Sequence, residues 1–194
     1  MSFIEKEKYQ NNLTQRYQDI HRDIIENCKQ GSVKAQYKLY QLYANAMFNI
    51  CVRMLNSKEE AEDLLQEAFS EAFYRLGFFR FESSFGAWLK RIVINKCINF
   101  LKLKRTEFVL SKDINSFDTV EEEEVDFEEI KLSVERIHKA VEQLADGYRV
   151  IFSLYMLEGY DHSEIAEILG ISESTSKSQF LRAKKKLKEI LEQE

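Results

Sequence analysis

The side chains with the clearest chemical potential lie near the C-terminal end, in GYDHSEIAEILGISESTSKSQFLRAKKKL. Asp161 precedes a short apolar run and Glu164 follows three residues later, which is the capping-box pattern of a helix start. Gly170 stands where this helix needs a left-handed terminating residue, and Ser172 can cap the next helix. Two helices joined by so tight a turn predict a helix-turn-helix, whose second helix enters the major groove of DNA.

The second of these helices is rich in side chains that bind DNA. Arginine and glutamine can read base edges through paired hydrogen bonds, whereas lysine, serine and threonine suit phosphates. The alternative is an ordinary helical hairpin with a solvated basic face, but the caps and the basic run favour DNA binding. The candidate contacts are Ser174, Thr175, Lys177, Ser178, Gln179, Arg182 and Lys185.

A second candidate site combines aromatic and basic side chains. Residues 78–88 include Phe78, Phe79, Phe81, Phe85 and Trp88, and residues 88–106 hold six bases and no acid. Aromatic faces among cations suit unstacked bases and a single-stranded backbone. The alternative is that most of these rings lie in the core, because Phe85 shares a helical face with Leu89 and Ile92. That alternative does not explain equally well why these six basic side chains have no acidic side chain among them.

A third candidate surface lies on a helix expected over residues 61–76, with Ser57 as a plausible N-cap. Its apolar residues recur at the spacing of a core-facing helix. The opposite face of this helix is polar, and such a face is most often merely solvated. Because this one is acidic and precedes a basic stretch, we expect it to bind a protein rather than DNA. Its polar side shows Asp63, Gln66, Glu67, Ser70 and Glu71.

Helical periodicity predicts the elements that position these sites. Helical patterns run through residues 34–105, with one helix starting at about Ser84, and through residues 130–192. Gly147 is expected to mark a break in the second region, and no strand alternation occurs. The chain has no proline, where about ten are expected at average usage, which favours uninterrupted helices. We therefore predict an all-α fold of two small helical domains.

The net charge of −5 is unevenly distributed along the 194 residues. Residues 106–130 hold ten acids and one base, and the remaining 27 bases and 23 acids give +4. An acidic stretch without clean periodicity cannot bury enough apolar surface to order itself, so we interpret it as a flexible linker. The predicted boundaries are an N-terminal extension (1–24), a first domain (25–105), the linker (106–131) and a second domain (132–194).

Several classes of function are disfavoured. The three histidines are isolated and lack metal-ligand spacing, and no GxxxxGK[ST] or GxSxG occurs, so we expect no enzyme, metal or cofactor. The three cysteines are unclustered and fit small core residues. No apolar run approaches a membrane span and no signal sequence begins the chain, so we expect a cytoplasmic protein without membrane insertion.

Three segments together resemble one family. EEAEDLLQEAFSEAFYRL, FRFESSFGAWLKRIVINKCINFL and GYDHSEIAEILGISESTSKSQFLRAKKKL are similar to the two domains of extracytoplasmic-function (ECF) sigma factors of bacterial RNA polymerase, in the family's order and with its acidic linker. The similarity covers about residues 25–105 and 135–192. It implies a transcription initiation factor with a region 2 helical bundle and a region 4 helix-turn-helix.

The resemblance also implies roles for the three surfaces. The DLLQEAF segment would bind the coiled coil of the largest core polymerase subunit, through Asp63, Leu64, Gln66, Glu67 and Phe69. The aromatic stretch and the helix after it would recognise and melt the −10 promoter element and capture a flipped base. The matching residues are Arg80, Phe81, Ser83, Ser84, Phe85, Trp88, Arg91, Asn95 and Lys96.

The second domain would read the −35 element, where Lys177, Ser178, Leu181 and Arg182 match the family's DNA contacts. The linker would thread through the polymerase cleft, and an anti-sigma factor is an expected partner. Two departures concern the sites. Ser176 stands where the family commonly has an apolar residue, so we expect packing there to rely on Phe180 and Leu181. Phe81 stands where the family often has glycine, and Gly86 stands where the family often has a polar or basic residue.

The alternative interpretation is a two-domain helix-turn-helix regulator that binds duplex DNA as a dimer, with the first domain as a sensor. The aromatic cluster at residues 78–88 separates the two hypotheses, because binding to duplex DNA does not require it.

Overall fold

The computed structural model of the chain describes residues 21–104 and 134–193. The chain divides into two compact units, residues 1–99 and residues 100–194, which are described one at a time. No residue in the two described ranges lies in a β-strand, so the predicted all-α class is confirmed there. The predicted acidic linker and most of the predicted N-terminal extension lie outside the described residues.

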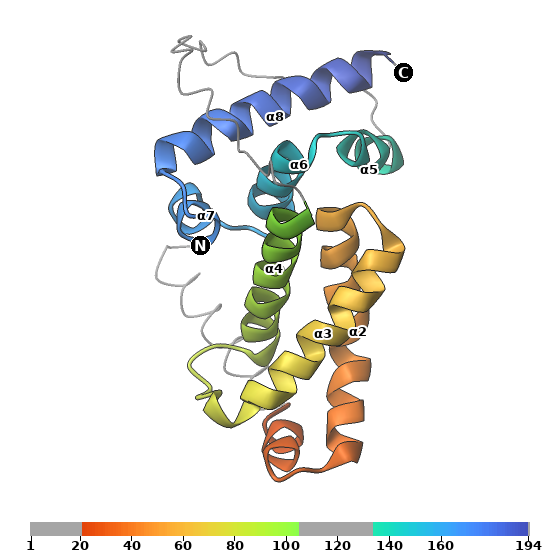
Figure 1. Cartoon of the computed structure of the whole chain (residues 1–194), viewed down its shortest axis with the longest axis vertical. Coiled ribbons are helices and arrows are strands. Elements are labelled where there is room, and N and C mark those ends of the chain that lie inside the picture. Colours follow the sequence, from red (N-terminus) through yellow and green to blue (C-terminus); the bar gives the residue numbers. More distant parts are fainter. Residues whose placement is uncertain (1–20, 105–133, 194) are drawn as a thin grey trace, which may run out of the picture. The chain divides into compact units, whose positions relative to one another are not determined.

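The first unit is built on the helix pair α2 (Val33–Leu55) and α3 (Lys58–Arg75), which pack against each other (Figure 1). Asn56 ends α2 in a left-handed conformation, with φ of 56°. Ser57 then begins α3, because its hydroxyl accepts a hydrogen bond from the amide of Glu60 at 3.3 Å. The predicted N-cap is therefore confirmed. The buried stripe of α3 consists of Ala61, Leu64, Leu65, Ala68, Phe69 and Ala72.

A short loop connects this pair to the third long helix. The 3-10 turn η1 (Leu76–Phe78) follows α3, residues 79–84 form the loop, and α4 (Phe85–Lys104) begins after it. The Ser84 hydroxyl accepts a hydrogen bond from the amide of Ala87 at 3.2 Å and caps α4, which begins next to the helix start predicted at about Ser84. Residues 21–29, which precede α2, are also helical and are called the N-terminal segment below.

The second unit contains α5 (Val134–Glu142), α6 (Asp146–Phe152), the π-helical turn η2 (Ser153–Leu157), α7 (His162–Leu169) and α8 (Glu173–Gln193). Helices α5, α6 and α7 all pack against α8. The break between α5 and α6 falls at residues 143–145, so Gly147 lies inside α6 and does not mark it. Arg149 holds this connection, donating hydrogen bonds to the Leu144 carbonyl (2.7 Å) and the Asp146 carboxylate (2.6 Å).

The helix-turn-helix forms as the sequence predicts. Asp161 accepts hydrogen bonds from the amides of Ser163 and Glu164, and the Glu164 carboxylate accepts one from the Asp161 amide, which completes the capping box. Gly170 has φ of 72°, a left-handed conformation that glycine adopts without a side-chain clash. Ser172 accepts a hydrogen bond from the amide of Thr175 at 3.0 Å and begins α8.

Candidate functional site

The aromatic cluster of residues 78–88 is divided between the core and the surface. Phe79 and Phe85 are buried, and each packs against Trp88 with ring centroids 5.1 and 5.6 Å apart. Phe85, which the resemblance matches to a DNA contact, has only 3% of its surface exposed and lies in the core. Phe78, in contrast, is 81% exposed, although its neighbours in the cluster pack inward. Sequence periodicity alone did not distinguish the exposed Phe78 from its buried neighbours in the cluster.

An open hollow of about 380 Å³ lies beside the loop of residues 79–84. Its walls combine aromatic rings, a guanidinium group, a hydroxyl and a carboxylate, which is the mixture that can stack and hydrogen-bond a nucleobase. Five of its six lining residues were predicted from the sequence as cluster members or DNA contacts, Phe78 and Phe79 only as part of the aromatic cluster, and Glu82 was not predicted. The residues that line it are Phe78, Phe79, Arg80, Glu82, Ser83 and Trp88.

Phe81 has φ of 60°, a left-handed conformation that costs a bulky residue about 1–3 kcal/mol. Its ring packs on Phe79 with centroids 4.9 Å apart. The departure from glycine noted in the sequence therefore falls at a position with a backbone conformation that glycine adopts freely. Surrounding contacts must hold Phe81 in place.

The helix α4 carries the predicted basic side chains in two different environments. Arg91 and Asn95 are exposed on its surface. Lys96 instead pairs with two carboxylates of α3, at 3.3 Å from Glu67 and 3.2 Å from Glu71. Burial lowers the pKa of Lys96, but hydrogen bonds and the charges of Glu71 and Glu67 outweigh it and raise the pKa above its ordinary value. Lys96 thus links the face of α4 to the acidic face of α3.

The acidic face of α3 exposes Asp63, Gln66 and Glu67 to solvent. Leu64 and Phe69, which the resemblance matches to polymerase contacts, are buried and support this face from beneath. This face borders a pocket of about 360 Å³ between α2 and α3. The α2 side of this pocket was not predicted, although Tyr40, Ala44 and Phe48 recur every four residues in the sequence. The lining residues are Tyr40, Ala44, Asn45, Phe48, Glu62, Leu65 and Gln66.

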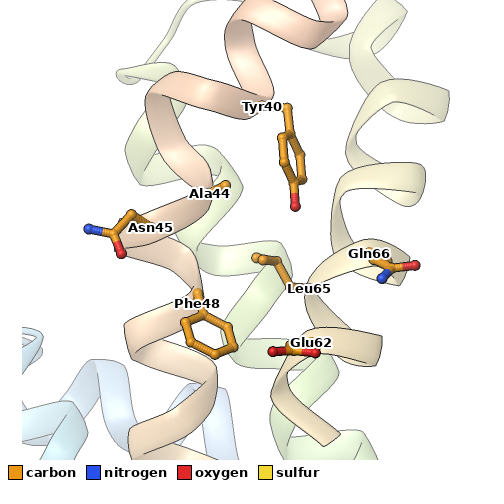
Figure 2. Close-up of a pocket in the computed structure, with 7 residues that line it drawn as sticks. All are labelled: Tyr40, Ala44, Asn45, Phe48, Glu62, Leu65 and Gln66. Carbon is orange, nitrogen blue, oxygen red and sulfur yellow. The ribbon is translucent and has the colours of Figure 1, made fainter. Parts of the chain in front are cut away.

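Figure 2 shows how this pocket is built. The rings of Tyr40 and Phe48 extend from α2 toward α3, where the Glu62 carboxylate and the Leu65 side chain face them. Apolar walls beside one carboxylate suit a long side chain with an aliphatic stem and a cationic end.

The predicted DNA face of α8 is mostly exposed. Ser174, Lys177, Ser178 and Lys185 are exposed, and Thr175, Leu181 and Arg182 are half-buried. The Lys177 ammonium lies 2.7 Å from the Glu173 carboxylate, whose hydrogen bond and charge raise the pKa of Lys177. Gln179, which the sequence predicted as a base-reading side chain, is only 5% exposed. Its position places it on the inner side of α8.

Ser176 is fully buried in the face of α8 that packs inward. Its hydroxyl lies 3.0 Å from Nδ1 of His162, and the His162 ring stacks on Tyr155 at 4.5 Å between centroids. Burying a hydroxyl without a hydrogen bond costs free energy, and His162 supplies a partner for Ser176. Phe180 packs on the same ring cluster, as expected, at 4.4 Å from Tyr155.

Comparisons with known proteins agree with this architecture. The family model of sigma-70 region 2 matches residues 39–106, and that of sigma-70 region 4 matches residues 134–187. The ECF RNA polymerase sigma factor SigW of Bacillus subtilis is 28% identical over 176 residues, which are 86% of this chain and 94% of that protein. The ECF RNA polymerase sigma factor SigM of B. subtilis is 30% identical over 155 residues, which are 79% of this chain and 93% of that protein.

A solved structure is similar as well. It is the sigma factor RpoE in complex with the anti-sigma factor NepR from Bartonella quintana. The alignment has a TM-score of 0.54 and 25% sequence identity, and it covers 82% of this chain and 98% of that chain. Among the described helices, none is both long and apolar enough to cross a membrane. The chain has a region 2 bundle and a region 4 helix-turn-helix, and relatives of the ECF class match most of its length. It therefore belongs to the ECF sigma factors of RNA polymerase, which are transcription initiation factors.

Proposed function

We propose that the hollow beside residues 79–84 captures an unstacked base of the −10 element. The observation that carries this proposal is the composition of the hollow, where the exposed Phe78 and the half-buried Trp88 offer ring faces beside Ser83 and Arg80. Unstacking a base step costs a few kcal/mol, which stacking on a ring and backbone contacts can offset. Arg91 and Asn95 of α4 would hold the adjoining strand.

The helix α8 would read the −35 element in this scheme. Arg182 is the proposed base-reading side chain, and Lys185 with Ser178 are proposed phosphate contacts. Gln179 is left out because it is buried. The proposed domain limits remain residues 25–105 and 132–194, joined by the acidic linker at 106–131. Because core polymerase and promoter DNA share the cytoplasm, the chain would act there.

The acidic face of α3 would bind the coiled coil of the largest polymerase subunit. The pocket between α2 and α3 extends this face and would take one long basic side chain, with Glu62 as its charge partner. The proposal is supported by Asp63 and Gln66, which lie exposed on the adjoining turns of α3. An anti-sigma factor is a further proposed partner, since RpoE of B. quintana was solved in complex with one.

Reconstitution with core RNA polymerase tests base capture. Promoters would be selected in vitro with the wild-type holoenzyme, and opening followed by permanganate reactivity of unpaired thymines. Phe78→Ala should slow opening about tenfold, because base–aromatic stacking contributes about 1–3 kcal/mol. Tyr74→Ala is the matched control, since Tyr74 is an aromatic residue of the same unit that is 86% exposed. Equal opening rates for the two variants would contradict the proposed base pocket.

The polymerase face has its own test. Asp63→Lys should weaken core binding in a fluorescence titration, because it places like charges opposite a basic partner. Glu135→Lys in α5 makes the same change of charge in the other unit and should bind core like the wild type. If wild-type protein bound promoter duplex tightly by itself and failed to bind core, the polymerase-dependent scheme would be wrong.

A further inference from the structure

The N-terminal segment holds the loop of residues 79–84 through two cationic side chains. The Lys29 ammonium donates a hydrogen bond to the Phe79 carbonyl at 2.9 Å, and the same nitrogen lies 4.4 Å from the centre of the Phe81 ring. The Arg22 guanidinium carbon lies 4.8 Å from the centre of that ring. One aromatic ring of the loop therefore contacts two cations from a single helical segment, an arrangement that the ring quadrupole favours.

Phe81 is the residue of this loop that most needs such support. Its φ of 60° is disfavoured for a side chain with a Cβ, so the loop holds this shape only where neighbouring contacts maintain it. The Phe81 ring packs on Phe79, and Phe79 both packs on Trp88 and lines the hollow. A change in the position of Phe81 would therefore move a wall of the proposed base pocket.

The segment itself is firmly attached to the bundle. Nδ1 of His21 lies 2.6 Å from the hydroxyl of Tyr43 on α2, and Ile25 and Cys28 are buried. The Tyr43 ring in turn packs against Phe85, the first residue of α4, at 5.1 Å between centroids. The cations that hold the loop thus project from an element whose own position is set by the core.

We propose that Lys29, with help from Arg22, is a positioning residue for base capture. It maintains the left-handed turn at Phe81 and so keeps the hollow in the shape that accepts an unstacked base, without itself contacting DNA. The Lys29 ammonium already has the Phe79 carbonyl and the Phe81 ring as partners, and the Glu26 carboxylate at 3.7 Å. This inference rests on the proposed function of the hollow. It also gives the end of the predicted N-terminal extension a role in promoter recognition.

The test measures base discrimination by the reconstituted holoenzyme. Promoters selected with the wild type would be compared with versions substituted at each non-template −10 position, and the ratio of opening rates recorded. Lys29→Met keeps the aliphatic stem and removes the charge, and it should reduce the discrimination ratio about three- to tenfold. Lys29→Arg should retain most of the wild-type discrimination ratio, because it keeps the positive charge. Lys34→Met, an equal change of charge at an exposed position of α2, should discriminate like the wild type.

Two further measurements separate positioning from other roles. A lysine that bound a phosphate would change the slope of log affinity against log salt by about one, whereas a positioning residue should leave that slope unchanged. Adding Lys29→Met to Phe81→Leu should cause a smaller loss than Lys29→Met causes in the wild type, because the lysine acts in part through the Phe81 ring. An altered salt slope or additive losses would overturn the proposal.

Failure of this inference can be told apart from failure of the base pocket itself. If wild-type protein and the Phe78→Ala variant discriminate equally, the base pocket is wrong. If the wild type discriminates, Phe78→Ala does not, and Lys29→Met matches the wild type, the pocket stands and the positioning role of Lys29 is wrong.

Discussion

Lys96 of α4 pairs with Glu67 of α3, with 3.3 Å between the ammonium nitrogen and the carboxylate oxygen. The sequence assigned these two residues to different surfaces, Lys96 to the promoter and Glu67 to the polymerase. The same ammonium also lies 3.2 Å from the Glu71 carboxylate. The two proposed surfaces therefore meet at one ion-pair cluster within a single helical bundle, and a partner that draws either residue away must replace this pairing.

The cluster should contribute unequally to stability. Glu71→Gln should lower the free energy of unfolding by about 0.5–1 kcal/mol, whereas Glu67→Gln should cost roughly 0–0.3 kcal/mol. Solvent screens the Lys96–Glu67 pair more strongly than the Lys96–Glu71 pair, because the Glu67 side chain is 69% exposed and that of Glu71 is 30% exposed. Urea unfolding followed by the fluorescence of Trp88, the only tryptophan, reports on this unit. A larger loss for Glu67→Gln than for Glu71→Gln would contradict this order.

Gly86→Ala should destabilise the first unit by about 1–2 kcal/mol. A Cβ at this position would lie 2.9 Å from Cε1 of Tyr43, whose ring is held by His21 and Phe85 and cannot easily move aside. Gly77→Ala is the matched control, because a Cβ there meets nothing within 4 Å. Urea unfolding should find the Gly77 variant close to the wild type, and an equal loss in both variants would remove the steric explanation.

The stability of the second unit should decrease as pH falls below about 6.5. Burial lowers the pKa of His162, and Lys177 lowers it further, against the opposing charges of Glu173 and Asp161. A lowered folded-state pKa means that the unfolded chain takes up the proton first, so this contribution is present above pH 6.5 and is lost at lower pH.

Calorimetry of the full chain between pH 7.5 and 5 can measure this effect. His162→Gln should flatten the pH dependence of the transition of this unit, because the amide does not titrate. His138→Gln, which changes an exposed histidine of α5, should retain the wild-type dependence. If His162→Gln and the wild type lost stability in parallel, titration of His162 would not be the cause.

Arg182→Ala should weaken recognition of the −35 element by about 1–3 kcal/mol, or roughly 5- to 150-fold. The expected signature is a reduced response to base substitutions in the −35 element, measured as run-off transcription by the holoenzyme. Lys186→Ala is a suitable control, because this lysine lies on the same helix and pairs with Glu189 at 3.0 Å. Identical responses of wild-type and Arg182→Ala protein to −35 mutants would remove the proposed role of this arginine.

Sequence alone predicted the features that depend on local interactions. The capping box at Asp161, the left-handed Gly170 and the cap at Ser57 were predictable because each involves residues a few positions apart. The helical class followed from periodicity and from the absence of proline. Likewise, the family follows from three motifs in their order along the chain.

The tertiary structure decided which of these side chains reach the surface and what they contact. The periodicity of α8 did not separate the buried Gln179 from its exposed neighbours, because a few tens of degrees around a helix axis move a side chain from core to solvent. The pairing of Lys29 with Phe81, 52 positions apart, and of Lys96 with Glu67 depends on how helices pack. The fold of the whole bundle determines such contacts, so the spacing of residues along the sequence does not predict them.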